Sequence, residues 1–528
     1  MESSFRGFLK TLRAHDELLE ISQPVDLRNV AALVPQADKA VLFTRPRGYS
    51  MPVVSGLLNS RARLALAMGV DYRAIEGKLR AAMDKPIAPK VVKKAPVKEV
   101  IQTGGKVDLY RLPVPVFGLM DGGPMITGAV VIAEDPEYGM NAGMYRLMIK
   151  EKNVTGIDIV TPNNLRRYAE RALQRRKPLP VSISIGVHPY EMIASTFKAA
   201  LGQNELGFAG GLRGEALKLA SGETVPVPSI ADAEIVLEGE IPPEGWVHPE
   251  GPFSEFNRLM GGLHMNPRVK IKAVMQRKEP VYYALHMPWE NIWMSAPIYE
   301  AAAYRVLREA GVTATAVNVT PGGCCHWHIA ASIRKSPGDG KNAIMALLAI
   351  ADIKHVVVTD DDIDVFDPID LEWAIATRVQ ADRDVLIVAN ARSKPLDPSL
   401  PPISGGIPTT AKMGIDATIP ENVPRERYMR IVYLNEGKTN LKNYLDPAGK
   451  GDERKSRALG QNGLGLEERL LKALAKAHAF FAEILELFRN EEFGAIAAAI
   501  GKLNREKKIA QDSEGKYYAL AEGLSQTR

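Results

Sequence analysis

The sequence His328-Ile-Ala-Ala-Ser-Ile333 predicts a buried strand. It is followed by the loop Ser336-Pro-Gly-Asp-Gly-Lys341, a helical run from Asn342 to Ala351, and a second apolar strand, His355-Val-Val-Val-Thr359. A helix that joins two strands in this way forms a βαβ unit, and such a unit implies a parallel sheet. We therefore predict an α/β domain over residues 321–455.

Upstream of this unit the pattern changes twice. Residues 1–110 combine a helical run, Phe5 to Leu19, with short apolar strands, and they predict an N-terminal α/β domain. A Lys- and Pro-rich strip from Lys85 to Lys98 predicts an exposed connector, because proline stops helices. Residues 111–320 carry short strands with Gly and Pro between them, which predicts a β-barrel or sandwich with inserted helices.

Residues 456–528 form a different kind of segment. Apolar residues recur there at helical spacing, and residues 507–519 predict a hairpin; the apolar residues are Leu470, Leu474, Ala477, Phe481, Ile484 and Phe488. A helix followed by a hairpin is similar to a small winged-helix cap. We expect an oligomer contact from this tail, with plain packing or DNA binding as the alternatives.

Length and composition limit the possible functions. A chain of 528 residues is expected to form two or three domains. Its net charge of +5 is too small to indicate nucleic-acid binding, and no apolar run is long enough to cross a bilayer. The first residues lack the pattern of a secretory signal, and the two cysteines, Cys324 and Cys325, are neighbours. These features predict a reducing, cytoplasmic setting.

The segment Glu250-Gly-Pro-Phe-Ser-Glu255 places two carboxylates five residues apart across a Gly-Pro turn. Such a pair can converge on one cavity, and acid–base catalysis needs one carboxyl that is held protonated and one that is held charged. Surface loops also carry glutamates at this spacing, so the motif alone leaves both interpretations open.

Two further segments combine polar and basic residues. Asn141-Ala-Gly-Met-Tyr-Arg146 places an arginine after a strand, and an arginine fork can pair with both oxygens of a substrate carboxylate. Asn204-Glu205 precedes a glycine-rich stretch, Ala209-Gly-Gly-Leu-Arg-Gly214, whose glycines could let the backbone approach a phosphate or cofactor closely.

Two other polar clusters are weaker candidates. Cys324-Cys-His-Trp-His328 collects side chains of the metal-binding type, but their spacing before a strand suits a zinc site poorly. The acidic run Asp360-Asp-Asp-Ile-Asp364 could surround a hard cation, or it could cap the helix that follows.

Taken in order, these segments resemble the UbiD family of flavin-dependent decarboxylases. The resemblance extends from about residue 5 to about residue 450. Beyond the segments quoted above it rests on Ala233-Glu-Ile-Val-Leu-Glu-Gly239, Trp373-Ala-Ile-Ala-Thr-Arg378 and Lys412-Met-Gly-Ile-Asp-Ala-Thr418. It implies an α/β multi-domain fold: an N-terminal α/β domain, a middle split β-barrel like that of flavin reductases, and a C-terminal α/β domain with a helical tail.

The resemblance also implies a set of cofactors. These are prenylated FMN, a divalent metal such as Mn²⁺ that bridges its phosphate, and a potassium ion. Asn141 and Glu205 would be metal ligands, and Asn164 stands where known members carry a histidine. Because an amide can offer its carbonyl oxygen to a hard metal, the departure changes the ligand but keeps a donor. Flavin contacts would come from Asn141, Asn163, Ser195, Thr196, Glu205 and Lys412.

The activity implied by the resemblance is reversible, non-oxidative decarboxylation of an aromatic, heteroaromatic or α,β-unsaturated acid, including aryl-CoA acids. Arg146 would bind the carboxylate, Glu255 would donate the proton, and Glu250 would orient Arg146. Residues 286–294, with two tryptophans, could line a flat pocket. The expected partners are a flavin prenyltransferase, the acid and CO₂, and further copies of this chain in a homodimer or larger oligomer. A non-catalytic subunit of a carboxylase complex is the alternative function.

Overall fold

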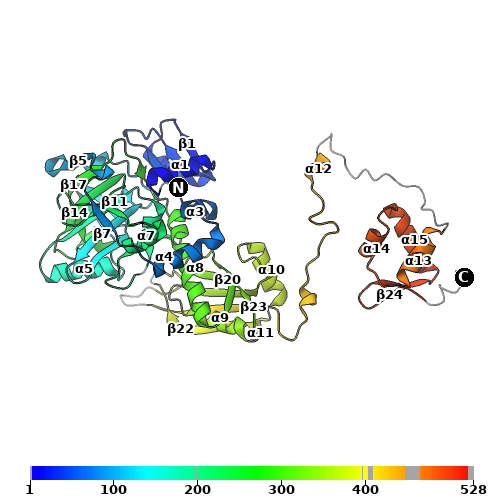
Figure 1. Cartoon of the computed structure of the whole chain (residues 1–528). Helices are drawn as coiled ribbons and strands as arrows, with labels where there is room; N and C mark the ends of the chain where they lie inside the picture. The colour runs from blue at the N-terminus through cyan, green and yellow to red at the C-terminus, as the bar shows by residue number, and fades with distance from the viewer. Residues whose placement is uncertain (1–2, 198, 395, 402–407, 446–463, 521–528) are drawn as a thin grey trace. The chain divides into compact units, whose positions relative to one another are not determined.

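Figure 1 shows the chain as a computed structural model, which describes residues 3–197, 199–394, 396–401, 408–445 and 464–520. The chain divides into two compact units, residues 1–423 and residues 424–528. The first unit contains three sheet-based regions, so the expected multi-domain α/β fold is confirmed. Within the described ranges, no helix is long and apolar enough to cross a membrane.

The N-terminal region is built on a four-stranded sheet in the order β1 (Leu18–Ile21), β2 (Ala40–Phe43), β3 (Val53–Ser55) and β18 (Tyr282–Tyr283). Helices α1 (Phe5–Ala14), α2 (Leu27–Leu33), α3 (Arg61–Met68) and α4 (Ile75–Asp84) accompany it. Strand β18 pairs in parallel with β3 although more than two hundred residues separate them in sequence. This long-range pairing fastens the N-terminal sheet to the end of the middle region.

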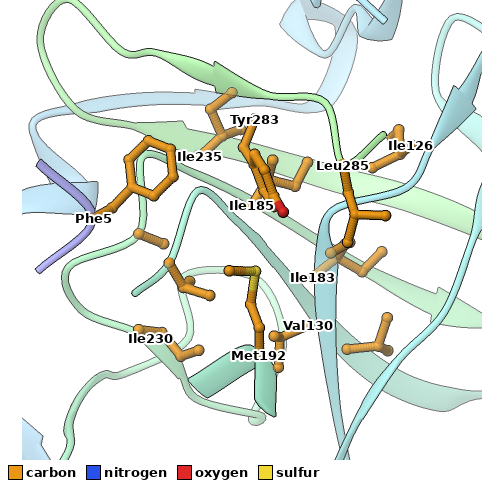
Figure 2. Packing of buried hydrophobic residues seen from close by; sticks show 14 of the residues in the cluster. Phe5, Ile126, Val130, Ile183, Ile185, Met192, Ile230, Ile235, Tyr283 and Leu285 are labelled. Carbon is orange, nitrogen blue, oxygen red and sulfur yellow. The ribbon is translucent and has the colours of Figure 1, made fainter. Parts of the chain in front are cut away.

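The middle region is a half-barrel of nine antiparallel strands. Their order is β6-β9-β10-β17-β14-β11-β7-β8, and β5 also pairs with β17. The strands are β5 (Val100–Thr103), β6 (Met125–Ile126), β7 (Ala129–Asp135), β8 (Gly139–Met144), β9 (Leu147–Glu151), β10 (Val154–Gly156), β11 (Leu179–Ile185), β14 (Ile235–Ile241) and β17 (Arg268–Gln276). Figure 2 shows how Ile183 and Ile185 of β11 pack with Val130, Tyr283 and Met192 in its core.

Residues 90–103 belong to the sheets of this middle region. Strand β4 (Lys90–Val92) pairs in parallel with β12 (Lys218–Ala220), which also pairs with β13 (Ser229–Ile230). Part of the strip that was expected to be an exposed connector is therefore a strand, and Val97 within it is fully buried. Strand β4 pairs with β12 and β5 pairs with β17, so the middle region begins before the expected boundary at residue 110.

Helices α5 (Asn164–Gln174) and α6 (Pro189–Thr196) pack on β7 and β8, and α7 (Glu205–Arg213) packs on β8 and α6. The glycines of α7 serve this packing. A Cβ on Gly210 would lie 2.2 Å from the Ile87 carbonyl oxygen, and one on Gly211 would lie 2.6 Å from the Ala82 carbonyl oxygen. These glycines thus allow α4 and the chain after it to approach α7 closely, where the sequence had suggested room for a phosphate or cofactor.

The C-terminal region of this unit is a five-stranded sheet in the order β19-β20-β21-β23-β22. Its strands are β19 (Thr313–Val319), β20 (His328–Arg334), β21 (His355–Asp360), β22 (Val385–Arg392) and β23 (Thr409–Ala417), and its helices are α8 (Trp289–Glu309), α9 (Asp339–Leu348), α10 (Pro368–Arg378) and α11 (Ala381–Asp384). Strands β20 and β21 pair in parallel, which confirms the predicted βαβ unit.

The second unit has a small core of its own. It contains α12 (Lys442–Leu445), α13 (Leu466–Leu474), α14 (Phe481–Leu487), α15 (Phe493–Arg505) and a hairpin of β24 (Ile509–Gln511) with β25 (Tyr517–Ala519). The hairpin was predicted. The apolar repeat is split between α13 and α14, and Ala477 between them is exposed. The expected domain boundary at 455/456 lies outside the described residues, and the oligomer contact stays a prediction.

Candidate active site

Three predicted catalytic residues converge at one end of the half-barrel. Arg146 lies in the two-residue connection between β8 and β9. Glu250 ends strand β15 (His248–Glu250), which pairs with β16 (His264–Asn266), and Glu255 follows on the loop. Gly251 has φ +92°, and a Cβ there would lie 2.9 Å from the Gly262 carbonyl oxygen. Glycine is required at this turn, which directs both carboxylates toward the arginine.

The guanidinium of Arg146 is surrounded by carboxylates. Nη1 donates to Glu255 Oε1 at 2.8 Å, and Nη2 donates to Glu250 Oε2 at 3.1 Å. A third carboxylate, that of Asp158, lies with Oδ2 2.9 Å from Nη2. The ring of Phe253 stacks against the guanidinium at 5.3 Å. The structure therefore brings the three predicted residues together and adds Asp158, which the sequence analysis did not identify.

Burial sets the electrostatics of this cluster. The Glu250 side chain is completely buried, and desolvation raises its pKa although Arg146 opposes the shift. Desolvation works against the charge of Arg146, but the carboxylates of Asp158, Glu250 and Glu255 outweigh it and raise the pKa of Arg146. Burial also lowers the pKa of nearby Lys150. The most strongly desolvated acid is Glu250, whereas the Glu255 side chain keeps 15% exposure.

A second polar cluster is formed by Asn141 on β8 and Glu205 at the start of α7. Asn141 Nδ2 donates to Glu205 Oε1 at 2.8 Å, and the Ala142 N–H donates to Oε2 at 2.9 Å. Asn141 Oδ1 is buried and has no hydrogen-bond partner among the described residues. Desolvation raises the pKa of Glu205 to about 7, against the opposing hydrogen bond from Ala142. An oxygen without a partner beside a desolvated carboxyl is a donor set that suits a hard cation.

The two neighbouring asparagines begin α5. Asn163 Oδ1 caps the helix by accepting from the Arg166 N–H at 2.8 Å, and it also accepts from the Tyr145 hydroxyl at 3.3 Å. Asn164 Nδ2 donates to the Ala199 carbonyl oxygen at 3.2 Å, on the segment between α6 and α7. Asn163 thus has a helix-capping role that the sequence analysis did not include.

The residues predicted to contact the flavin differ in their surroundings. Ser195 lies near the end of α6, and its Oγ is buried without a hydrogen-bond partner in the part of the chain that the structure describes. Thr196 Oγ1 donates to the Ile193 carbonyl oxygen at 2.8 Å. Ser195 is therefore the member of this pair whose hydroxyl is left for a bound group.

Lys412 on β23 has a different role from the expected phosphate contact. Its Nζ donates to the carbonyl oxygens of Leu348, Ile350 and Ala351 at 2.8, 2.9 and 3.2 Å. An ammonium has three donors, so all of them are used at the C-terminal end of α9, where a cation complements the helix dipole. The structure does not bring Lys412 to the other predicted cofactor residues.

The segment 286–294 contributes one residue toward the active site. Trp293 belongs to the core of the C-terminal region, where Arg61 stacks over it at 5.2 Å, and Trp289 packs against the same core. His286 instead packs edge-on against Phe117 at 6.1 Å, and Phe117 packs on Phe253. Trp293 is a core residue, Trp289 is partly buried with Arg258 stacked over it at 5.2 Å, and His286 connects to the arginine cluster through Phe117.

The acidic run 360–364 is held by arginines. Buried Arg378 of α10 pairs with Asp362 at 2.6 Å and with Asp360 at 3.3 Å, and Asp360 also accepts from the Ile419 N–H. Asp364 pairs with Arg73 at 3.1 Å. Arginine side chains thus supply positive charge at this run, and among the described residues no group of three or more His, Cys, Asp or Glu side chains is arranged to hold a metal ion.

Comparison with known proteins places this geometry in context. Family models of 3-octaprenyl-4-hydroxybenzoate carboxy-lyase match the chain in three parts: the N-terminal domain over residues 9–83, the Rift-related domain over 90–288 and the C-terminal domain over 292–417. An anhydromevalonate phosphate decarboxylase from Methanothermobacter thermautotrophicus is 33% identical over 81% of this chain and 99% of its own. A phenolic acid decarboxylase from Sedimentibacter hydroxybenzoicus is 31% identical over 80% and 93%.

Solved structures agree with these matches. The UbiD-class enzyme HmfF from Pelotomaculum thermopropionicum, in complex with FMN, has a TM-score of 0.80 at 40% identity and covers 84% of this chain and 100% of its own. An evolved dimeric form of HmfF in complex with prFMN has a TM-score of 0.77 at 37% identity, with coverage of 84% and 100%. The family models end at residue 417, so the second unit lies beyond them.

Proposed function

The chain belongs to the UbiD family of carboxy-lyases, and we propose that it is a reversible, non-oxidative decarboxylase of an aromatic, heteroaromatic or α,β-unsaturated acid that uses prenylated FMN. The observation that carries this proposal is the convergence of Glu250 and Glu255 on Arg146. This arrangement combines a carboxylate-binding fork with two carboxyls in different environments. Binding of an acid and delivery of a proton both need such groups.

The cofactor would be held by the second cluster. Asn141 Oδ1 and the Glu205 carboxylate would ligate a divalent metal such as Mn²⁺, with Asn164 as the third ligand, and the Ser195 hydroxyl would contact the flavin. The atoms without partners at Asn141 and Ser195, together with the desolvated Glu205, support this assignment. When bound, prenylated FMN supplies the electron sink that decarboxylation of an unsaturated acid requires.

Arg146 would receive the substrate carboxylate. Because three carboxylates already surround the guanidinium, the substrate must displace one of them. Glu255 is the best candidate, since it lies on the loop after β15 and is partly exposed, whereas Glu250 is completely buried. Asp158 is also partly exposed, but its other carboxylate oxygen accepts from Asn266 Nδ2 at 3.2 Å. A Glu255 carboxyl released from Arg146 is then free to carry the proton that replaces CO₂.

The substrate is proposed only as a class. Relatives of similar identity act on anhydromevalonate phosphate and on phenolic acids, so the family match does not select one acid. The aromatic surface of Phe253 and Phe117, with His286 beside it, favours a flat unsaturated substrate. We also propose that a flavin prenyltransferase supplies the cofactor in the cytoplasm and that the chain forms a homodimer or larger oligomer.

A CO₂-exchange assay tests the proposed function. The protein is co-expressed with a flavin prenyltransferase, purified without oxygen, and incubated with ¹³C-bicarbonate and a panel of acids: 4-hydroxybenzoate, 2-furoate, cinnamate and sorbate. Incorporation of ¹³C into at least one acid is the expected result. A Glu255→Gln variant should retain the cofactor and lose exchange by about 100-fold or more, the usual contribution of a general acid. Cofactor-loaded wild type that exchanges none of these acids, or a variant with wild-type rates, would contradict the proposal.

A further inference from the structure

Asp158 is fixed in place beside the active-site arginine. Its Oδ2 lies 2.9 Å from Arg146 Nη2, and its Oδ1 accepts from Asn266 Nδ2 at 3.2 Å. Asn266 is completely buried on β16, and its own Oδ1 accepts from the Ile159 N–H at 3.0 Å. The hairpin of β15 and β16 therefore carries Glu250 on one strand and, on the other, the residue that holds Asp158.

The backbone gives Asp158 the same neighbour. Its N–H donates to the Arg146 carbonyl oxygen at 3.2 Å, because β9 and β10 turn back on each other between the two residues. The side chain and the main chain of Asp158 thus both contact Arg146. A carboxylate that is attached on both of its oxygens and at its own backbone holds a nearly fixed geometry, which is what a partner needs to orient an arginine fork.

The charges around Arg146 do not balance if every group is ionised. Three carboxylates, those of Asp158, Glu250 and Glu255, face two cations, Arg146 and Lys150. His264 pairs with Glu250 across the β15–β16 hairpin, His248 on β15 pairs with Glu244, and Asp121 accepts from the Ser254 N–H on the loop between the two glutamates. One proton held on a carboxyl makes the set of five charged groups neutral. Desolvation of Glu250, which raises its pKa, agrees with a proton that stays in the cluster.

We propose that Asp158 is a positioning residue of the active site, which orients Arg146 and whose negative charge keeps one proton on the Glu250–Glu255 pair at neutral pH. The inference rests on the proposed function. Both carboxyls contact Arg146, so a proton on either one leaves the five groups neutral, and the acid that protonates the product stays loaded. Without the charge of Asp158, two carboxylates and two cations already balance, and the pair loses its proton at lower pH.

The Asp158→Asn variant isolates this charge, because the amide keeps the size and one oxygen acceptor of the side chain. The first readout is the pH profile of CO₂ exchange, with the acid that wild type uses best. Loss of activity at high pH reports deprotonation of the acid, and this limb should move down by roughly one to two pH units, as expected for a unit charge removed at close range. Glu240→Gln, which removes a carboxylate that pairs with Lys272 in the same half-barrel, should leave the limb unchanged.

The second readout does not need turnover. A carboxyl with a raised pKa in the folded state destabilises the fold as pH increases, and removing the Asp158 charge lessens that effect. The Tm of Asp158→Asn minus that of wild type should therefore increase between pH 5 and pH 8, whereas the same difference for Glu240→Gln stays constant. A flat difference for Asp158→Asn, or an unshifted pH limb, overturns the inference. A wild type that exchanges no acid refutes the proposed function alone, since the thermal readout still tests Asp158.

Discussion

The Arg146→Met substitution tests the active-site cluster through protein stability. It removes the cation from three carboxylates, one of them on the completely buried Glu250. Breaking a buried ion pair by removing one partner typically costs about 3–5 kcal/mol. The first unit has 423 residues, and at ~2.1 cal/mol/K per residue its unfolding entropy is about 0.9 kcal/mol/K. We therefore expect the Tm to fall by about 3–6 °C at pH 8.

The sign of the pH dependence follows from linkage. Without Arg146 nothing in the pair opposes the desolvation that raises the pKa of Glu250 above its unfolded value, so the folded state binds more protons. The variant should recover stability as pH falls, and at pH 5.5 its Tm should lie within about 1–2 °C of wild type. Differential scanning calorimetry at both pH values measures this.

A matched control separates the cluster from a general loss of charge. Arg268 pairs with Glu244 at 2.7 Å, but both side chains are about 30% exposed, so Arg268→Met should cost less than about 1 kcal/mol. The hydrogen bond from Arg268 lowers the pKa of Glu244 to about 2, so that carboxyl stays ionised at both pH values. An equal Tm loss for Arg146→Met at pH 5.5 and pH 8, or a loss no larger than that of Arg268→Met, would refute the reasoning.

Three further predictions follow from other sites. Glu205→Gln should release the metal, so elemental analysis should show loss of bound Mn²⁺ with an unchanged far-UV spectrum; full metal content would contradict the assignment. Lys412→Met should lower stability by about 1–3 kcal/mol, because one buried and two partly buried carbonyl oxygens lose their donor, and should leave flavin content unchanged; a drop in flavin content at native stability would instead support the predicted phosphate contact. Burial raises the pKa of Glu300, which accepts from the Tyr72 hydroxyl, to about 8, so wild type should lose stability as pH rises from about 5 to about 8. Glu300→Gln should flatten that loss. A Glu300→Gln variant whose stability falls with pH as steeply as that of wild type between pH 5 and pH 8 would refute the assignment.

Much of the architecture could be predicted because it is encoded locally. The βαβ unit over residues 328–359 and the hairpin over 507–519 each depend on a short run of residues, and both are present. The pairing of β18 with β3 could not be predicted, because a two-residue strand gives no periodic signal and its partner is far away in sequence. The split between α13 and α14 was missed because the apolar spacing continues across the mostly exposed residues that separate them.

In the active site, too, residues in local motifs could be predicted and a residue placed by long-range folding could not. Arg146, Glu250 and Glu255 lie in recognisable motifs, and the structure brings them together. Asp158 was missed because its approach to Arg146 depends on the return of the chain through β9 and β10, which no motif records. Lys412 was assigned to a phosphate because sequence indicates that a lysine is present but not which carbonyl oxygens will surround its ammonium.

The central claim is that this chain binds prenylated FMN, and one measurement tests it most directly. The protein is co-expressed with a flavin prenyltransferase and purified without oxygen in the presence of Mn²⁺. The absorbance spectrum and the mass of the released cofactor are then recorded. We expect the mass of prenylated FMN at close to one equivalent per chain. A folded protein that releases no flavin under these conditions would contradict the account and would favour a non-catalytic subunit.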